Sequence, residues 1–137
     1  MKLQGFDITC DVQATRKYRD RYNQQCECDQ CKHFRLNFHK HYPESVKLLN
    51  QFGIDILYPL EIMDLGFQNG KREYSVFYSV KGELPEDKIE LKNCELTFIF
   101  RNWKIASESY ANTGMQKPYF IIEVSNIFLS DLQVQSD

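Results

Sequence analysis

The spacing of apolar residues changes at the turn formed by residues 68–70. Before this turn, apolar side chains recur at every fourth position, as in Phe34, Phe38 and Tyr42, which is typical of a helix that buries one face. After it, residues 74–80 alternate along the chain in the manner of a strand. Because the helices come first and the strands last, the sequence predicts an α+β fold, with N-terminal helices packed on a C-terminal antiparallel sheet of three to four strands.

Residues 1–66 are predicted to be mainly helical. Three of the four expected helices have a terminal residue that favours a start or an end, which is Asp or Pro at the start or Gly after the last turn. The expected helices are residues 12–22 after Asp11, a second that begins near Cys31, a third between Pro43 and Gly53, and a short fourth over Leu60–Leu65 between Pro59 and Gly66.

Residues 67–137 are predicted to be mainly β. Alternation predicts strands over Tyr74–Val80, Cys94–Phe100 and Tyr119–Leu129, with a further short strand at Lys88–Leu91. The longest polar connection, Ala106–Lys117, is expected to be a loop between strands. A length of 137 residues is close to the commonest domain size, so residues 1–137 are predicted to form a single domain.

Three of the five cysteines, Cys26, Cys28 and Cys31, lie close together in one Cys-x-Cys-x-x-Cys motif. Thiolates this close can share one soft metal ion, and zinc usually takes four such ligands in a tetrahedron. The motif therefore predicts a structural zinc site with these three residues as ligands. An odd number of cysteines, with three of them clustered, also favours a reducing compartment over a disulfide framework.

The fourth zinc ligand stays open at this point. His33 would lie ~200° around the helix axis from Cys31, at about 100° per residue, and would point away from the ion if the helix begins at Cys31. Cys10 precedes a helix of the expected length and should lie about 16 Å from the loop. Cys94 is expected on a strand, and a water molecule or a second chain are the remaining alternatives.

A second interpretation of the same residues is thiol–disulfide chemistry. Cys28 and Cys31 form a Cys-x-x-Cys pair at an expected helix N-terminus, where the pKa of a thiol is lowered. Cys26 would then act as a resolving thiol. The preceding residues 22–25 are polar, whereas such oxidoreductase motifs usually follow a buried strand, so the metal interpretation is preferred.

A third interpretation is nucleic-acid binding by the N-terminal third of the chain. The first 41 residues hold eight Lys or Arg against five Asp or Glu, and the remainder holds nine against fourteen. Basic residues that interleave with aromatic ones can contact phosphates and stack bases; they are Arg16, Lys17, Arg19, Arg21, Lys32, Arg35 and Lys40. The net charge of −2 favours a solvated helix face instead.

Signals that the sequence lacks limit the expected location and function of the protein. The N-terminus lacks the continuous apolar region of a signal peptide, and no apolar run approaches the roughly 20 residues of a membrane span, so a cytoplasmic protein without membrane contact is expected. The sequence contains no Gly-rich phosphate loop and no nucleophile elbow. We therefore expect a non-enzymatic protein that binds or regulates another protein.

Three segments within residues 15–65 carry a resemblance to known sequences. They are Cys26-x-Cys28-x-x-Cys31-x-x-Phe34, Leu49 followed by Phe52-Gly53-Ile54-Asp55, and Pro59-x-Glu61. Together they resemble small bacterial proteins, chiefly of Gram-positive species, that have no established function. The resemblance implies a small cytoplasmic bacterial protein and assigns no catalytic or binding residue.

Overall fold

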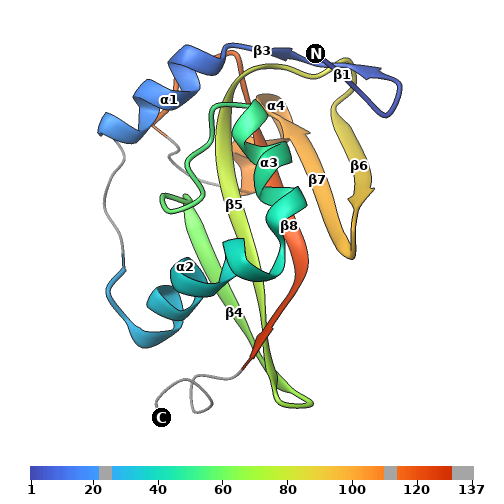
Figure 1. Cartoon of the computed structure of the whole chain (residues 1–137). Coiled ribbons are helices and arrows are strands. Elements are labelled where there is room, and N and C mark those ends of the chain that lie inside the picture. The colour runs from blue at the N-terminus through green and yellow to red at the C-terminus, as the bar shows by residue number, and fades with distance from the viewer. Residues whose placement is uncertain (22–25, 110–113, 131–137) are drawn as a thin grey trace.

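The computed structural model describes residues 1–21, 26–109 and 114–130, and its main element is a curled antiparallel sheet of six strands (Figure 1). These strands are β3 (Thr9–Cys10), β4 (Glu61–Gln68), β5 (Lys71–Glu83), β6 (Lys88–Asn93), β7 (Leu96–Asn102) and β8 (Tyr119–Ser130). They lie in the order β3, β5, β8, β7, β6, and β4 pairs with the first part of β5. A separate hairpin consists of β1 (Lys2–Leu3) and β2 (Phe6–Asp7).

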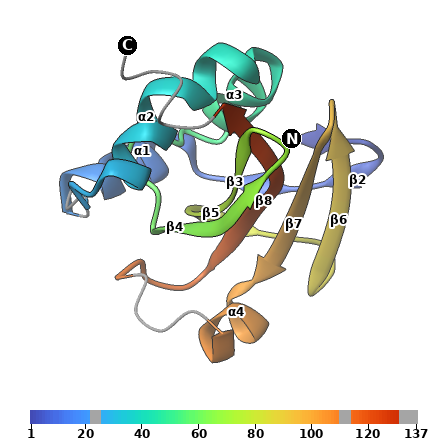
Figure 2. The ribbon, with the colours of Figure 1, turned by 90° about the horizontal axis from the view of Figure 1, so that it is seen from below.

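Helices cover both faces of this sheet. They are α1 (Val12–Arg21), α2 (Asp29–His41), α3 (Pro43–Gln51) and α4 (Trp103–Ser109). Seen from below, α1, α2 and α3 lie on one side of the sheet and α4 lies on the other (Figure 2). None of the helices among the described residues has the length and hydropathy that a bilayer span requires.

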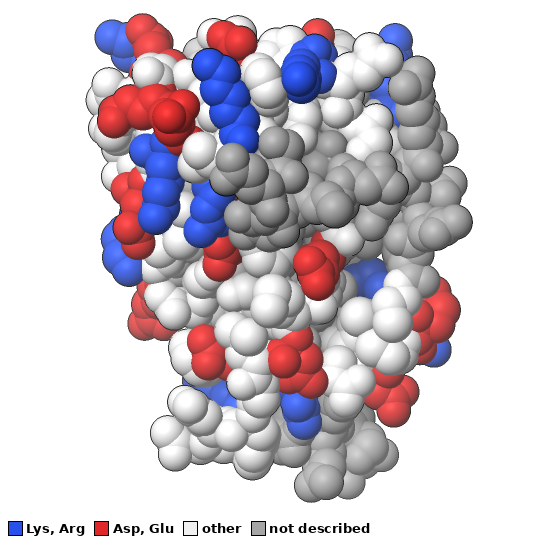
Figure 3. Space-filling view, turned by 180° about the vertical axis from the view of Figure 1, so that it is seen from behind, with Lys and Arg blue, Asp and Glu red and all other residues white. Residues whose placement is uncertain are grey.

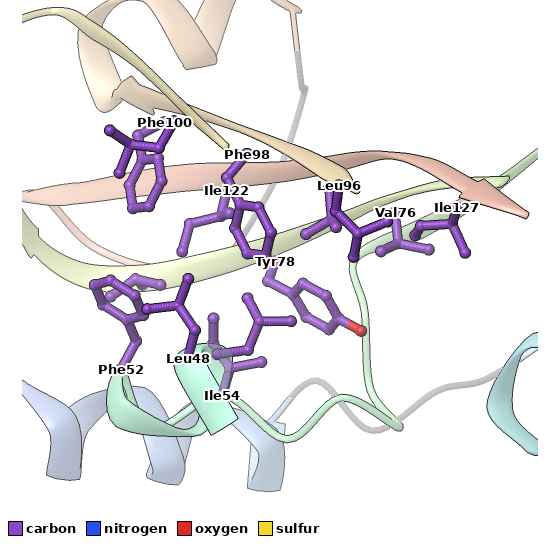
Figure 4. Close-up of a cluster of buried hydrophobic side chains, with 14 of the residues drawn as sticks. Leu48, Phe52, Ile54, Val76, Tyr78, Leu96, Phe98, Phe100, Ile122 and Ile127 are labelled. Carbon is purple, nitrogen blue, oxygen red and sulfur yellow. The ribbon is translucent and has the colours of Figure 1, made fainter. Parts of the chain in front are cut away.

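Most of the hydrophobic core lies between the sheet and helices α2 and α3. Figure 4 shows Leu48 and Phe52 facing the sheet, where they meet side chains of β5, β7 and β8. The aromatic rings interlock, because Phe52 makes edge-to-face contacts with both Phe100 and Phe120, at centroid distances of 5.8 and 6.1 Å. Burying each such side chain contributes about 1.5–3 kcal/mol, so this layer is the main source of stability.

The central strand β5 is buried on both faces. Tyr78 belongs to the main core, whereas Phe77 packs against Ala106 of α4 and against Tyr119 and Ile121 of β8. The continuous burial of residues 74–80 follows from this two-sided cover. The strands predicted around residues 74–80, 88–91 and 119–129 are confirmed as β5, β6 and β8.

The predicted ends of the first three helices are confirmed in their main features. The backbone N–H of Ala14 donates to Asp11 Oδ1 at 3.0 Å, which caps α1, and Pro43 occupies the first turn of α3. Gly53, after α3, has φ +88°, and a Cβ there would overlap the carbonyl oxygen of Val12 in α1. Glycine at this position therefore permits both the turn and the close approach of α1.

The predicted arrangement, an α+β fold with N-terminal helices on a C-terminal sheet of three to four strands, is wrong. The structure is dominated by the six-stranded sheet, and its helices are small. Two of the strands come from the half of the chain that was expected to be helical, since β3 and β4 both precede Gly70. Both add to β5, whose backbone groups would otherwise lack partners along that edge.

Two local predictions are also wrong. Residues Leu60–Leu65, expected to be helical, belong mostly to β4, where Ile62 pairs with Val76 and packs against the core. A helix of one or two turns is unstable by itself, whereas pairing with β5 satisfies the backbone. Cys94, expected on a strand, is exposed in the turn between β6 and β7 and has φ +56°. The predicted loop Ala106–Lys117 begins inside α4, and residues 110–113 lie outside the described residues.

A β-bulge interrupts the pairing of β4 with β5 between Asp64 and Gly66. The carboxylate of Asp64 accepts a hydrogen bond from the backbone N–H of Gly66 at 3.0 Å. It also accepts two from Arg72 Nη1, at 3.1 and 2.9 Å. The bulge is thus fixed by a side chain of the strand itself and by its neighbour on β5.

Substitutions at two glycines distinguish two contributions to the free energy of unfolding: the strain of a side chain at positive φ and the clash of that side chain with a neighbouring helix. Gly70 also has a positive φ, of +78°, but open space surrounds its Cα. Gly70→Ala should lower the free energy of unfolding by about 1 kcal/mol, and Gly53→Ala by about 2 kcal/mol or more, because only the second also displaces Val12. Urea unfolding measures both values; equal losses would contradict the close packing of α1 against Gly53.

Candidate metal centre

The three clustered cysteines converge in space. The Sγ atoms of Cys26, Cys28 and Cys31 all lie within 4.8 Å of one another. In a tetrahedral zinc site with Zn–S distances of about 2.3 Å, neighbouring sulfur atoms lie about 3.8 Å apart. The described geometry is thus close to what one shared ion requires, and the predicted convergence of these residues is confirmed.

Local backbone structure explains this convergence. Cys28 is the N-cap of α2, with extended φ and ψ of −67° and 161°, and its Sγ accepts a hydrogen bond from the backbone N–H of Cys31 at 3.5 Å. Cys31 lies in the first turn of the helix and is buried, whereas Cys26 and Cys28 are exposed. The helix start therefore brings three sulfur atoms together with one of them at the base of the site.

The surroundings of Cys28 and Cys31 shift the pKa values of their thiols in opposite directions. The backbone N–H of Cys31 lowers the pKa of Cys28, and hydrogen bonds involving the Cys26 and Cys31 side chains lower it further. Burial is the main reason why the pKa of Cys31 rises to about 12, and the neighbouring Cys28 and Cys26 thiols add to that rise. In the metal-free cluster, Cys28 therefore ionises at lower pH than Cys31.

Charged side chains beside the cysteines are paired across the loop. Glu27 lies 3.8 Å from Lys32 Nζ and 3.9 Å from Arg35 Nη2, and the Arg35 side chain is only 12% exposed. These contacts connect the loop to α2 independently of any metal. They also engage two of the basic residues that suggested nucleic-acid binding.

Basic side chains form no continuous surface on the described part of the face opposite Figure 1, because Figure 3 shows Lys and Arg interspersed with Asp and Glu there. The side chains of Arg19 and Arg21, and all of Tyr22, lie outside the described residues. Nucleic-acid binding by the N-terminal basic residues stays a prediction.

His33, one candidate for the fourth ligand, is used elsewhere. It is buried in α2, and its Nδ1 lies 2.7 Å from the hydroxyl of Tyr74 in β5. That hydroxyl donates to the carbonyl oxygen of Gln30 at 3.2 Å, and burial raises its pKa, so it stays protonated. The two contacts hold the first turn of α2, and with it Cys31, against the sheet.

The other candidates on the chain also lie away from the cluster. Cys10 is half-buried in β3, its Sγ donates to the carbonyl oxygen of Phe52 at 3.5 Å, and burial raises its pKa to about 11. Cys94 is exposed in the turn after β6 and not on a strand as expected. Among the described residues, no other Cys, His, Asp or Glu joins the three sulfur atoms.

Sequence reasoning did not find the Glu27–Arg35 pair or the anchor from Tyr74. In the Glu27–Arg35 pair, the acidic residue precedes the basic one by eight positions. This spacing predicts a contact only if the loop that carries Glu27 turns back along α2. No pattern in the sequence indicates the anchor from Tyr74, because it joins residues 41 positions apart.

No protein-family model, curated protein or solved structure matches this chain. The chemical assignment of the cluster therefore depends on its own geometry and donor set.

The two pKa shifts predict different alkylation profiles in metal-free, reduced protein. A lowered pKa means more thiolate at a given pH, so iodoacetamide should modify Cys28 with a midpoint below the ordinary value of about 8.5. Cys31 should stay protonated and unmodified until much higher pH. Mass spectrometry of peptides that separate the two residues measures both profiles, and urea-unfolded protein is the control. Identical midpoints in folded and unfolded protein would contradict the described helix start.

Proposed function

We propose that Cys26, Cys28 and Cys31 bind one zinc ion, which fixes the loop to the start of α2. The observation that carries this proposal is the mutual distance of the three sulfur atoms, all within 4.8 Å. Thiolate donors favour zinc, copper(I) and iron–sulfur clusters over hard cations. Zinc fits this set of three thiolates best. Iron–sulfur clusters usually take four cysteines at other spacings, and zinc does not change its oxidation state, so it suits a structural site.

The zinc has a structural role in this proposal, and the protein acts by binding another protein rather than by catalysis. The position of the cluster supports such a role, since an ion there would connect an exposed loop to the first turn of a helix that packs in the core. Phe34 and Phe38, which share the face of α2 that carries Cys31, are fully buried and stack at a centroid distance of 4.9 Å. The cytoplasmic location and bacterial origin expected from the sequence belong to the same proposal.

Metal analysis of purified, untagged protein tests the zinc site. Under reducing conditions the wild type should carry close to one zinc per chain. Cys31→Ser should carry little or none, because the base of the site is lost. Cys94→Ser is the matched control, since it removes an exposed thiol outside the cluster and should retain the metal.

Two results would contradict the zinc site. One is a reduced wild-type protein without stoichiometric metal after zinc has been supplied. The other is equal zinc content in Cys31→Ser and in the wild type.

A thiol–disulfide function of Cys28 and Cys31 is the second candidate, and one observation favours it. The exposed thiol of Cys28 at the N-cap of α2 stands beside the buried thiol of Cys31 in the first turn, so Cys28 can meet an external disulfide, and Cys31, in place of the Cys26 expected from the sequence, can resolve the mixed disulfide. In this exchange the two cysteines lose two electrons and two protons, and the external disulfide leaves as two thiols.

Equilibration of metal-free protein with oxidised and reduced glutathione separates the two candidates. If the second is correct, a Cys28–Cys31 disulfide forms reversibly, while Cys94 stays a thiol or carries only glutathione. Peptide mass spectrometry identifies the linkage. Random pairing that includes Cys26 as often as Cys28 would count against a dedicated redox pair.

A further inference from the structure

We infer that a zinc ion in this cluster keeps one coordination position for a donor from outside the chain, and that this donor is a small thiolate. The inference rests on the proposed zinc site and specifies it further. It depends on three features of the described residues: the number of ligands on the chain, the direction in which the cluster is open, and the softness of its donor atoms.

Every cysteine and histidine of the chain lies in the described ranges. Among them, only the three clustered cysteines are placed to bind a common ion. Cys10 donates to Phe52, and Cys94 lies in the β6–β7 turn. His33 faces Tyr74 inside the fold. The two other histidines, His39 and His41, are exposed in the last turn of α2, at the far end of the helix from the cluster.

Carboxylates do not complete the set in the described part of the chain. Glu27 and Asp29 are both adjacent to the cysteines in sequence; the two oxygens of Glu27 face Lys32 and Arg35, and Asp29 lies in the first turn of α2. No Asp or Glu side chain within the described ranges joins the three sulfur atoms. An ion held here by the described residues therefore has three protein ligands, which is the pattern of a zinc site with an exchangeable fourth position.

The cluster is open toward solvent rather than toward the core. Cys31 is the buried member, while Cys26 and Cys28 are exposed on the loop that precedes α2. An ion shared by the three sulfur atoms has its closed side against the first turn of the helix. Its remaining position thus faces a side from which a small molecule can approach.

The donor set favours a thiolate as the fourth donor. Zinc with three thiolates carries a net charge of −1, and a fourth thiolate makes it −2. Lys32 and Arg35 against Glu27 and Asp29 leave no net side-chain charge beside the cluster, and the N-terminus of α2 adds a partial positive charge of about 0.5. That partial charge offsets part of the negative charge, and a sulfur donor matches the softness of the three donors already present.

Cobalt(II) substitution tests the open position directly, because the visible absorption of tetrahedral cobalt depends on its ligands. Cobalt-loaded protein, kept reduced with a phosphine, is titrated with 2-mercaptoethanol while the cobalt content and the molar mass are followed. We expect a saturable shift of the visible bands with one thiol bound per cobalt and one cobalt per chain. The Cys94→Ser variant should give the same shift as the wild type.

The outcomes separate this inference from the zinc site on which it rests. If the wild type takes up neither zinc nor cobalt, the zinc site itself is wrong. Two results contradict the open coordination position and leave the metal site itself supported. In one, cobalt binds without any change of its spectrum on addition of thiol; in the other, the thiol removes the cobalt without a spectrally shifted intermediate. One cobalt shared by two chains would also overturn the inference, because a second copy would then supply the fourth donor.

Discussion

β5 and β8 pair antiparallel from Lys71 opposite Ser130 to Lys81 opposite Tyr119, with one irregularity between Tyr74 and Val76. β5 has β3 and β4 on its other edge, β8 has β7 on its other edge, and β6 is added to β7. The helices then cover the two faces that this pair presents. Because the pair joins segments about 40 to 60 residues apart, the centre of the sheet depends on a contact between distant parts of the chain.

The cluster of cysteines depends on the same strand pair through one side chain. Tyr74 reaches from β5 to His33 and to the carbonyl oxygen of Gln30, both on α2, and its ring packs edge-on against Phe34 at a centroid distance of 5.8 Å. These contacts set the position of the first helical turn. The loop that carries Cys26 and Cys28 is therefore supported by the core, although its two sulfur atoms are exposed.

The sequence was informative where structure is determined locally. Asp11, Pro43 and Gly53 act through neighbouring backbone groups, and the helix ends that they predict are confirmed. The three sulfur atoms also converge as predicted, because they are separated by only a few bonds around a helix start. The strands near residues 74–80 and 119–129 were predictable from alternation alone, since both lie against a core.

Prediction failed where long-range pairing decides the conformation. Residues 61–68 carry a proline before and apolar residues within, a pattern that suits a short helix as well as a strand, and only the free edge of β5 selects the strand. The same applies to residues 9–10, which are too short to show any period. The contact of His33 with Tyr74 was equally hidden, because it too joins residues far apart in the sequence.

The bulge in β4 has a consequence for the behaviour of the protein in solution. Among the described strands β4 pairs only with β5, and its side chains Met63, Leu65 and Phe67 are 40%, 48% and 52% exposed. An uninterrupted strand with such residues would be a template for the strands of other molecules. Here the Asp64 carboxylate accepts the N–H of Gly66 and pairs with Arg72 of β5, and the bulge interrupts the regular strand, so the edge offers only short stretches to an incoming chain. The bulge thereby limits the length of apolar edge that a strand of another molecule could extend.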